Sequence, residues 1–180
     1  MEIQLLKKRV RALLWFFIVS LIFWGSTAFP LQWEINILQR TIGVGAPLGN
    51  FWPAMANWIS LVHKGLTEMY QKYPFIAYGT DWLAFAHLVI AVAFWGPIRD
   101  PVKNIWVVEF GMIACIMVIP LAMICGPIRG IPFFWRLLDC SFGVFGIIPL
   151  WVAHRDIRRI MEIEGKTPSD AQSARLCGSG

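Results

Sequence analysis

The sequence contains little charge, and this scarcity excludes an ordinary soluble domain. Only 15% of its 180 residues are charged, while 57% are hydrophobic. Soluble proteins average about 25% charged residues. A soluble domain of this length would bury its apolar residues in one core, but here they gather in runs long enough to cross a bilayer. The composition therefore indicates an integral membrane protein.

Common enzyme and metal motifs are also absent. The chain contains no G-x-S-x-G, P-loop, G-x-G-x-x-G or H-E-x-x-H motif. Its three histidines are too scattered to bind haem or a metal, and its four cysteines show no C-x-x-C spacing. We therefore expect no cofactor and no metal, and the catalytic residues of any activity stay unknown. Cys125 and Cys140 fall near the same predicted membrane face, and the sequence leaves open whether they pair.

A basic stripe of the kind that binds nucleic acid is missing as well. The net charge is +5, but the lysines and arginines form short clusters beside hydrophobic runs. A nucleic-acid-binding protein instead gathers them on one polar face. Basic clusters that flank spans control membrane topology. The expected partners are therefore membrane lipids, and nucleic acid is excluded.

The apolar runs predict an all-α fold, an integral membrane four-helix bundle that forms a single transmembrane domain over residues 1–165. Residues 166–180 are expected to form a flexible tail, and its end, Gly178-Ser179-Gly180, is interpreted as a cloning remnant. The four predicted spans lie at about residues 12–29, 82–98, 105–125 and 131–153.

The segment between the first two spans, residues 30–80, predicts an outer loop with helices of its own. Apolar residues recur every three or four positions from Met55 to Tyr73, which is typical of an amphipathic helix. We expect this helix, over residues 53–73, to lie on the membrane surface and pack on the bundle. A shorter helix is expected near residues 33–41.

The distribution of lysine and arginine predicts the orientation. If both termini face the cytoplasm, eleven of these residues lie inside and five outside. Cytoplasmic segments carry the excess of basic residues. The expected location is the bacterial cytoplasmic (inner) membrane, with both termini cytoplasmic and the long loop outside.

Ionisable side chains within spans are costly in lipid and mark candidate sites. We predict a ligand-binding pocket whose lining residues are Asp81, Trp82, His87, Arg136 and Asp139. Structural alternatives stay open. Arg136 and Asp139, three residues apart, can pair on one helix face. Asp81 can cap the second span, and His87 can bond a neighbouring helix. Glu109, also near a span end, is expected to serve structure.

Two short motifs resemble the EXPERA family of four-span membrane proteins, which includes sterol isomerases. They are Ile119-Pro120 and the run Phe142-Gly143-Val144-Phe145-Gly146-Ile147-Ile148-Pro149. The layout of spans and long loop is also similar. The family's acidic residue on span two falls at Asp81, whereas Pro30 stands near the place of its acidic residue after span one. The resemblance implies a pocket for a sterol-like or lipid-like ligand that opens towards the bilayer.

Three functions are compatible with these features. The first is binding of a hydrophobic, lipid-like or sterol-like ligand in an intramembrane pocket, extending to an isomerase-like enzyme. The second is an accessory or scaffolding subunit of a larger membrane assembly, without catalysis, whose partner is another membrane protein or a second copy of the chain. The third is a small transporter, for which four spans suffice only in an oligomer.

Overall fold

The computed structural model describes residues 2–165, and every regular element in that range is helical. This confirms the predicted all-α fold. The chain divides into two compact units. Unit 1 comprises Met1–Ser20 and Ala91–Gly180, and unit 2 comprises Leu21–Ile90. The unit boundaries fall inside two long helices, α1 (Glu2–Ser26) and α4 (Tyr78–Ala93).

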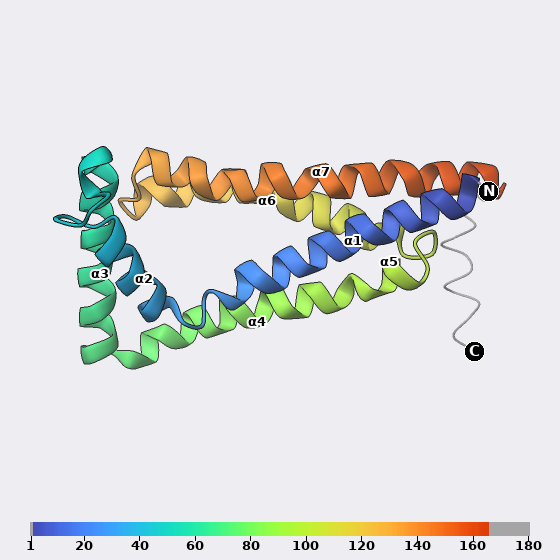
Figure 1. Cartoon of the computed structure of the whole chain (residues 1–180). Helices are drawn as coiled ribbons and strands as arrows, with labels where there is room; N and C mark the ends of the chain where they lie inside the picture. The colour runs from blue at the N-terminus through green and yellow to red at the C-terminus, as the bar shows by residue number, and fades with distance from the viewer. Residues whose placement is uncertain (1, 166–180) are drawn as a thin grey trace. The chain divides into compact units, whose positions relative to one another are not determined.

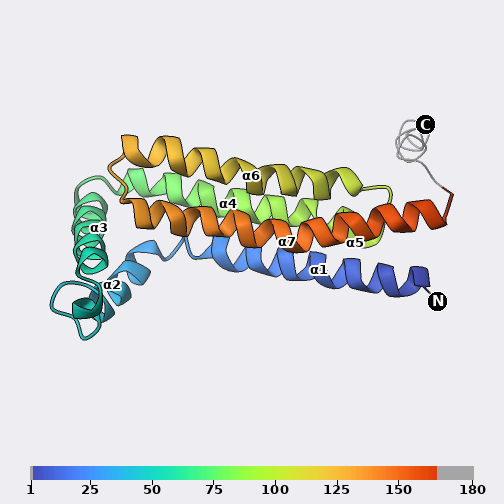
Figure 2. The ribbon, with the colours of Figure 1, turned by 90° about the horizontal axis from the view of Figure 1, so that it is seen from above.

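Unit 1 is built around an antiparallel helix pair, α6 (Ile105–Ile128) and α7 (Phe133–Ile163), which run side by side in Figures 1 and 2. The first part of α1 packs against α7, and the short helix α5 (Trp95–Arg99) precedes α6. The side chains that form the buried core of this unit include Val10, Leu14, Phe94, Val108, Leu150 and Ile157.

Glycines set the close approach of α6 and α7. A Cβ atom at Gly143 of α7 would overlap the backbone oxygen of Cys115 on α6. One at Gly111 would lie 2.6 Å from Cζ of Phe94 and 2.9 Å from Cδ1 of Leu150. Helices in lipid gain little from burying apolar surface against each other, so small residues that allow close van der Waals packing take over.

Unit 2 contains the two helices predicted for the outer loop. They are α2 (Leu31–Thr41) and α3 (Pro53–Lys72), which pack on each other. Pro53 occupies the first turn of α3, where its missing N–H costs nothing. Pro74 ends it, because the residue before a proline avoids the helical region. The turns η1 (Gly49–Phe51) and η2 (Pro74–Ala77) flank α3, and η2 leads into α4.

Within residues 2–165, four helices are long and apolar enough to cross a membrane, which confirms the predicted number of spans. Their bounds are Glu2–Ser26, Pro74–Arg99, Ile105–Ile128 and Phe133–Ile163. All four extend beyond the predicted spans, most of all α1, which begins ten residues before residue 12, and α7, which continues ten residues after residue 153. The predicted tail over residues 166–180 lies outside the described residues.

Candidate functional site

Asp81 and Trp82 lie in the first turns of α4. Asp81 is half-buried within the helix, which already begins at Tyr78, so the alternative that Asp81 caps this span is wrong. Trp82 is 56% exposed. Its ring meets the rings of Tyr78 and Phe85 edge to face, at centroid distances of 6.0 and 5.7 Å. We call these three rings the aromatic trio, and they form an exposed face of α4.

His87 lies one to two turns further along α4 and points away from the aromatic trio. It is half-buried, and a Cβ atom at Gly25 of α1 would overlap the Cβ of His87. Its Nδ1 lies 2.8 Å from the backbone oxygen of Leu83. Because a carbonyl oxygen only accepts, Nδ1 carries the proton, and a neutral ring then keeps its lone pair on Nε2. His87 can therefore accept a hydrogen bond from a hydroxyl group.

Arg136 lies near the start of α7, on the side that faces α6. Its Cγ and Cδ pack against Gly126, where any side chain would overlap them. Its guanidinium lies over the ring of Phe133, 5.2 Å from the centroid. Its Nε is buried and makes no hydrogen bond to any residue between 2 and 165. Gly126 thus leaves space for the side chain of Arg136 between α6 and α7. The buried Nε–H group of that side chain has no hydrogen-bond acceptor within residues 2–165.

Asp139 follows Arg136 by one turn. It is half-buried, and the buried Gly143 lies one turn further along the same face of α7. Within residues 2–165, no ion pair joins Arg136 to Asp139. The alternative in which Arg136 and Asp139 satisfy each other as an ion pair is therefore not seen in the structure. The two ionisable side chains lie near the same end of α7 without forming a salt bridge to each other.

The five predicted site residues are divided between the two units. Arg136 and Asp139 belong to unit 1, whereas Asp81, Trp82 and His87 belong to unit 2. The structure brings Arg136 and Asp139 together on one helix face. A common pocket for all five residues stays a prediction.

Two other expectations concern the helix pair of unit 1. Glu109 of α6 accepts from Nε2 of His154 on α7 at 3.1 Å, a contact that joins the two helices, and its expected structural role stays a prediction. Cys125 and Cys140 are both free thiols, which answers the question of whether they pair.

Sequence reasoning missed a set of polar contacts between α2 and α3, which we call the polar ladder. It has three rungs. Ser60 donates to Gln39 at 2.9 Å, His63 donates to Asn36 at 2.9 Å, and Gln32 donates to Thr67 at 3.1 Å. The signal was present, because both segments place these residues at spacings of three and four. Part of the polar face of α3 therefore faces α2.

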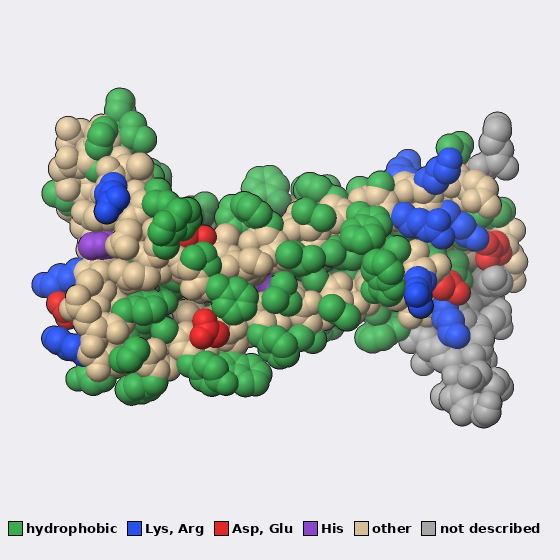
Figure 3. Space-filling model, turned by 60° about the horizontal axis from the view of Figure 1, so that its bottom comes forward, with side chains coloured by type: hydrophobic (Ala, Val, Ile, Leu, Met, Phe, Trp, Pro, Cys, Tyr) green, Lys and Arg blue, Asp and Glu red, His purple; other side chains and the backbone are tan. Residues whose placement is uncertain are grey.

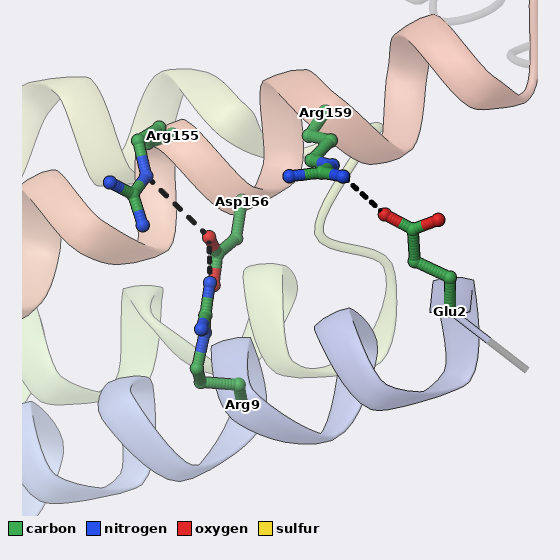
Figure 4. Close-up of polar contacts among 5 residues, drawn as sticks. All are labelled: Glu2, Arg9, Arg155, Asp156 and Arg159. Atoms are coloured by element: carbon green, nitrogen blue, oxygen red, sulfur yellow. Dashed lines mark hydrogen bonds and ion pairs between the residues drawn. The ribbon is translucent and has the colours of Figure 1, made fainter.

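It also missed a buried ion pair between α1 and α7. Asp156 is only 2% exposed, and both of its carboxylate oxygens accept from the guanidinium of Arg9 (Figure 4). Arg155 lies 3.9 Å from the same carboxylate. The signal was the register of Asp156, since it falls among the buried residues Ala153, Ile157 and Ile160 of α7. Both residues lie in the parts of α1 and α7 that extend past the predicted spans.

Comparisons of the chain with family models, with curated proteins and with solved structures find no match. The EXPERA resemblance therefore stays a prediction. The site must be interpreted from its own geometry.

Proposed function

We propose that this integral membrane protein binds a lipid-like ligand, and that Arg136 and Asp139 hold the polar group of that ligand. The observation that carries the proposal is the buried Nε of Arg136, which has no hydrogen-bond partner within residues 2–165. Buried polar groups in native proteins are nearly always bonded, so an unused donor calls for an explanation.

The physical reason is the cost of a charge in a membrane span. An arginine in a span is costly unless it is paired or solvated, and near the end of a span its long side chain normally extends to the interface. Here the packing against Gly126 and Phe133 restricts how far the side chain of Arg136 can move towards the interface. An oxygen of a ligand would satisfy Nε, and Asp139 would accept from a hydroxyl group of the same ligand. An isomerase-like reaction is the narrower version that the EXPERA resemblance implies.

The test is native mass spectrometry of the whole chain in mild detergent. We expect the wild type to retain a lipid-sized mass, and Arg136→Met or Asp139→Asn to lose it while the protein stays helical. Arg129→Met is the matched control, because it removes an exposed positive charge just after α6 and should retain the mass. If Asp139→Asn lowers thermal stability with bound lipid unchanged, the two residues serve structure. If it changes neither quantity, the site is incidental.

A second candidate function is an accessory subunit of a larger assembly, and the exposure of α4 favours it. Only 11% of the most apolar window of this span is buried, against 22–28% in the others. The aromatic trio lies on its exposed face. Either lipid or another chain covers this surface. Native mass spectrometry distinguishes them, because a subunit gives a second copy or a foreign chain at fixed stoichiometry.

We further propose an orientation with both termini in the cytoplasm of a bacterial cell, which rests on the eleven-to-five distribution of lysine and arginine.

We also propose that α3 lies in the outer interfacial layer. Its residues Lys64, Glu68 and Lys72 are exposed, while Ile59 is buried and Leu66 is half-buried. This division of polar and apolar residues suits a helix between headgroups and hydrocarbon.

A further inference from the structure

A second region of unit 1 is rich in positive charge, and we call it the basic end. It comprises residues 2–11, 99–103 and 155–164, which carry nine lysines and arginines against five aspartates and glutamates. Figure 3 shows basic side chains gathered at this end of the unit. Ion pairs with acidic residues leave an excess of positive charge, so the basic end attracts anions.

Three arginines of the basic end lie along the contact between α1 and α7, as Figure 4 shows. Arg9 holds both oxygens of Asp156, and Arg159 pairs with Glu2. Arg155 makes only the longer contact of 3.9 Å to Asp156. Two carboxylates therefore face three guanidinium groups. The side chains of Arg155 and Arg159 remain 60% and 62% exposed, so both present N–H groups outward.

A hollow lies on α1 beside Arg9. Its volume is about 330 Å³, and its lining residues are Glu2, Leu5, Leu6 and Arg9. Glu2 is the ion-pair partner of Arg159, so the hollow leaves space at the basic end next to that pair.

The outer face of α7 suits a ligand that is apolar at one end and anionic at the other. Val144, Ile148, Trp151 and Arg155 follow one another at spacings of three and four, so they form one stripe. The first three are 49%, 54% and 53% exposed. The guanidinium of Arg155 lies over the ring of Trp151, 5.6 Å from the centroid. Tryptophan belongs at headgroup level. Acyl chains would thus lie along Val144 and Ile148, with a phosphate at Arg155.

We propose that the basic end binds the phosphodiester headgroup of an anionic phospholipid, with Arg155 and Arg159 as the headgroup ligands and Val144 and Ile148 against the acyl chains. Arginine suits this role, because its planar fork of N–H groups matches two phosphate oxygens. The proposal does not depend on the ligand assigned to Arg136 and Asp139, since the two sites lie at opposite ends of α7.

The test titrates the delipidated whole chain in mild detergent with phosphatidylglycerol or phosphatidylcholine and counts bound lipids by native mass spectrometry. We expect the wild type to bind phosphatidylglycerol more tightly. Each basic residue near an anionic headgroup contributes about fivefold in affinity. Arg155→Gln and Arg159→Gln should each weaken phosphatidylglycerol binding by about that factor, with phosphatidylcholine unaffected. Both residues are well exposed, so the fold should tolerate these changes.

Arg99→Gln is the matched control. Arg99 also lies at the basic end, over the ring of Trp95 at 5.9 Å, but it belongs to α5 and takes no part in the ion pairs between α1 and α7. Its loss should change the affinity by less than about twofold. Equal binding of the two lipids, or an equal loss in Arg99→Gln, would overturn the proposal. Displacement of phosphatidylglycerol by millimolar inorganic phosphate would also overturn it, because the site would then recognise a soluble anion.

Discussion

The helix pair α6–α7 and the helix pair α2–α3 are both antiparallel, but different contacts hold them. In α6–α7, glycine brings backbones together, and Gly143 meets the backbone of Cys115 directly. In α2–α3, the contact is the polar ladder, whose three rungs join polar side chains. Both α6 and α7 are long and apolar enough to cross a membrane, whereas α2 and α3 are not among such helices within residues 2–165.

The difference follows from the surroundings in which each helix pair forms, lipid for α6–α7 and the region near water for α2–α3. In lipid, an apolar side chain gains little by leaving hydrocarbon for protein, so close packing and a few polar contacts specify the partner. Near water, hydrogen bonds between side chains compete with hydration and contribute modestly, but they fix the register of two helices. The predictions below test whether the glycines and the polar ladder have these separate roles.

Gly143→Ala should have the largest effect. The added Cβ would overlap the backbone oxygen of Cys115, and backbone cannot move aside without shifting a helix. We expect the free energy of unfolding to fall by about 3 kcal/mol. Denaturant titration in mixed micelles measures it. Gly79→Ala on α4 is the control, because its Cβ would meet no atom within 4 Å. Equal stability of the two variants would contradict the role of glycine packing.

Arg9→Met should have the next largest effect, since it leaves the buried carboxylate of Asp156 without its main partner. Removing one partner of a buried carboxylate is strongly destabilising, and the exposure of the Arg9 guanidinium reduces this loss. Lys7→Met removes the partner of Glu164, whose carboxylate is 20% exposed against 2% for Asp156, and should cost less than about 1 kcal/mol. Thermal melts of both variants in detergent provide the comparison. A larger loss in Lys7→Met would show that burial does not control these pairs.

The polar ladder should show a smaller, local effect. A double-mutant cycle of Asn36→Ala and His63→Ala isolates the middle rung. We expect a coupling energy of about 1 kcal/mol, the usual contribution of one hydrogen bond. Hydrogen exchange of the α3 amides measures it locally. A coupling near zero would mean that apolar contacts alone join α2 to α3.

Gly65→Ala should have the smallest effect and the opposite sign. Gly65 lies inside α3, and a Cβ there would meet no atom within 4 Å. Alanine reduces the conformational entropy that glycine loses on folding, so α3 should gain about 0.5–1 kcal/mol. Hydrogen exchange of α3 should slow accordingly. A destabilised α3 would indicate that this position contacts something outside the described chain.

The spans could be predicted from the sequence because length and hydropathy alone determine them. The helix over Pro53–Lys72 could also be predicted, since its apolar period is strong. The ends of α1 and α7 that extend past the predicted spans were missed, because those spans were assigned from apolar runs and these ends carry charged residues. The pair between Arg9 and Asp156 was missed because one sequence gives no sign of which distant charges meet.

For the candidate site, the residue types were predictable and their partners were not. The ionisable character of Arg136 and Asp139 is visible in the sequence, and their spacing of three suggested a pair. In the structure Arg136 instead packs against Gly126 and Phe133. It can do so because Gly126 on α6 has no side chain and leaves space for it. His87 likewise bonds the backbone oxygen of Leu83 in its own helix through Nδ1. Only the structure shows that Nε2 is then the nitrogen left to accept a hydrogen bond.

The central claim, that the chain crosses the membrane four times with both termini inside, is tested most directly by cysteine accessibility. Lys64→Cys and Arg158→Cys, each in a cysteine-free chain, place single thiols at exposed positions separated by three spans. In intact cells, a membrane-impermeant maleimide should label position 64 at once and position 158 only after permeabilisation. Labelling of both positions from the outside, or protection of 64 with labelling of 158, would contradict the assignment.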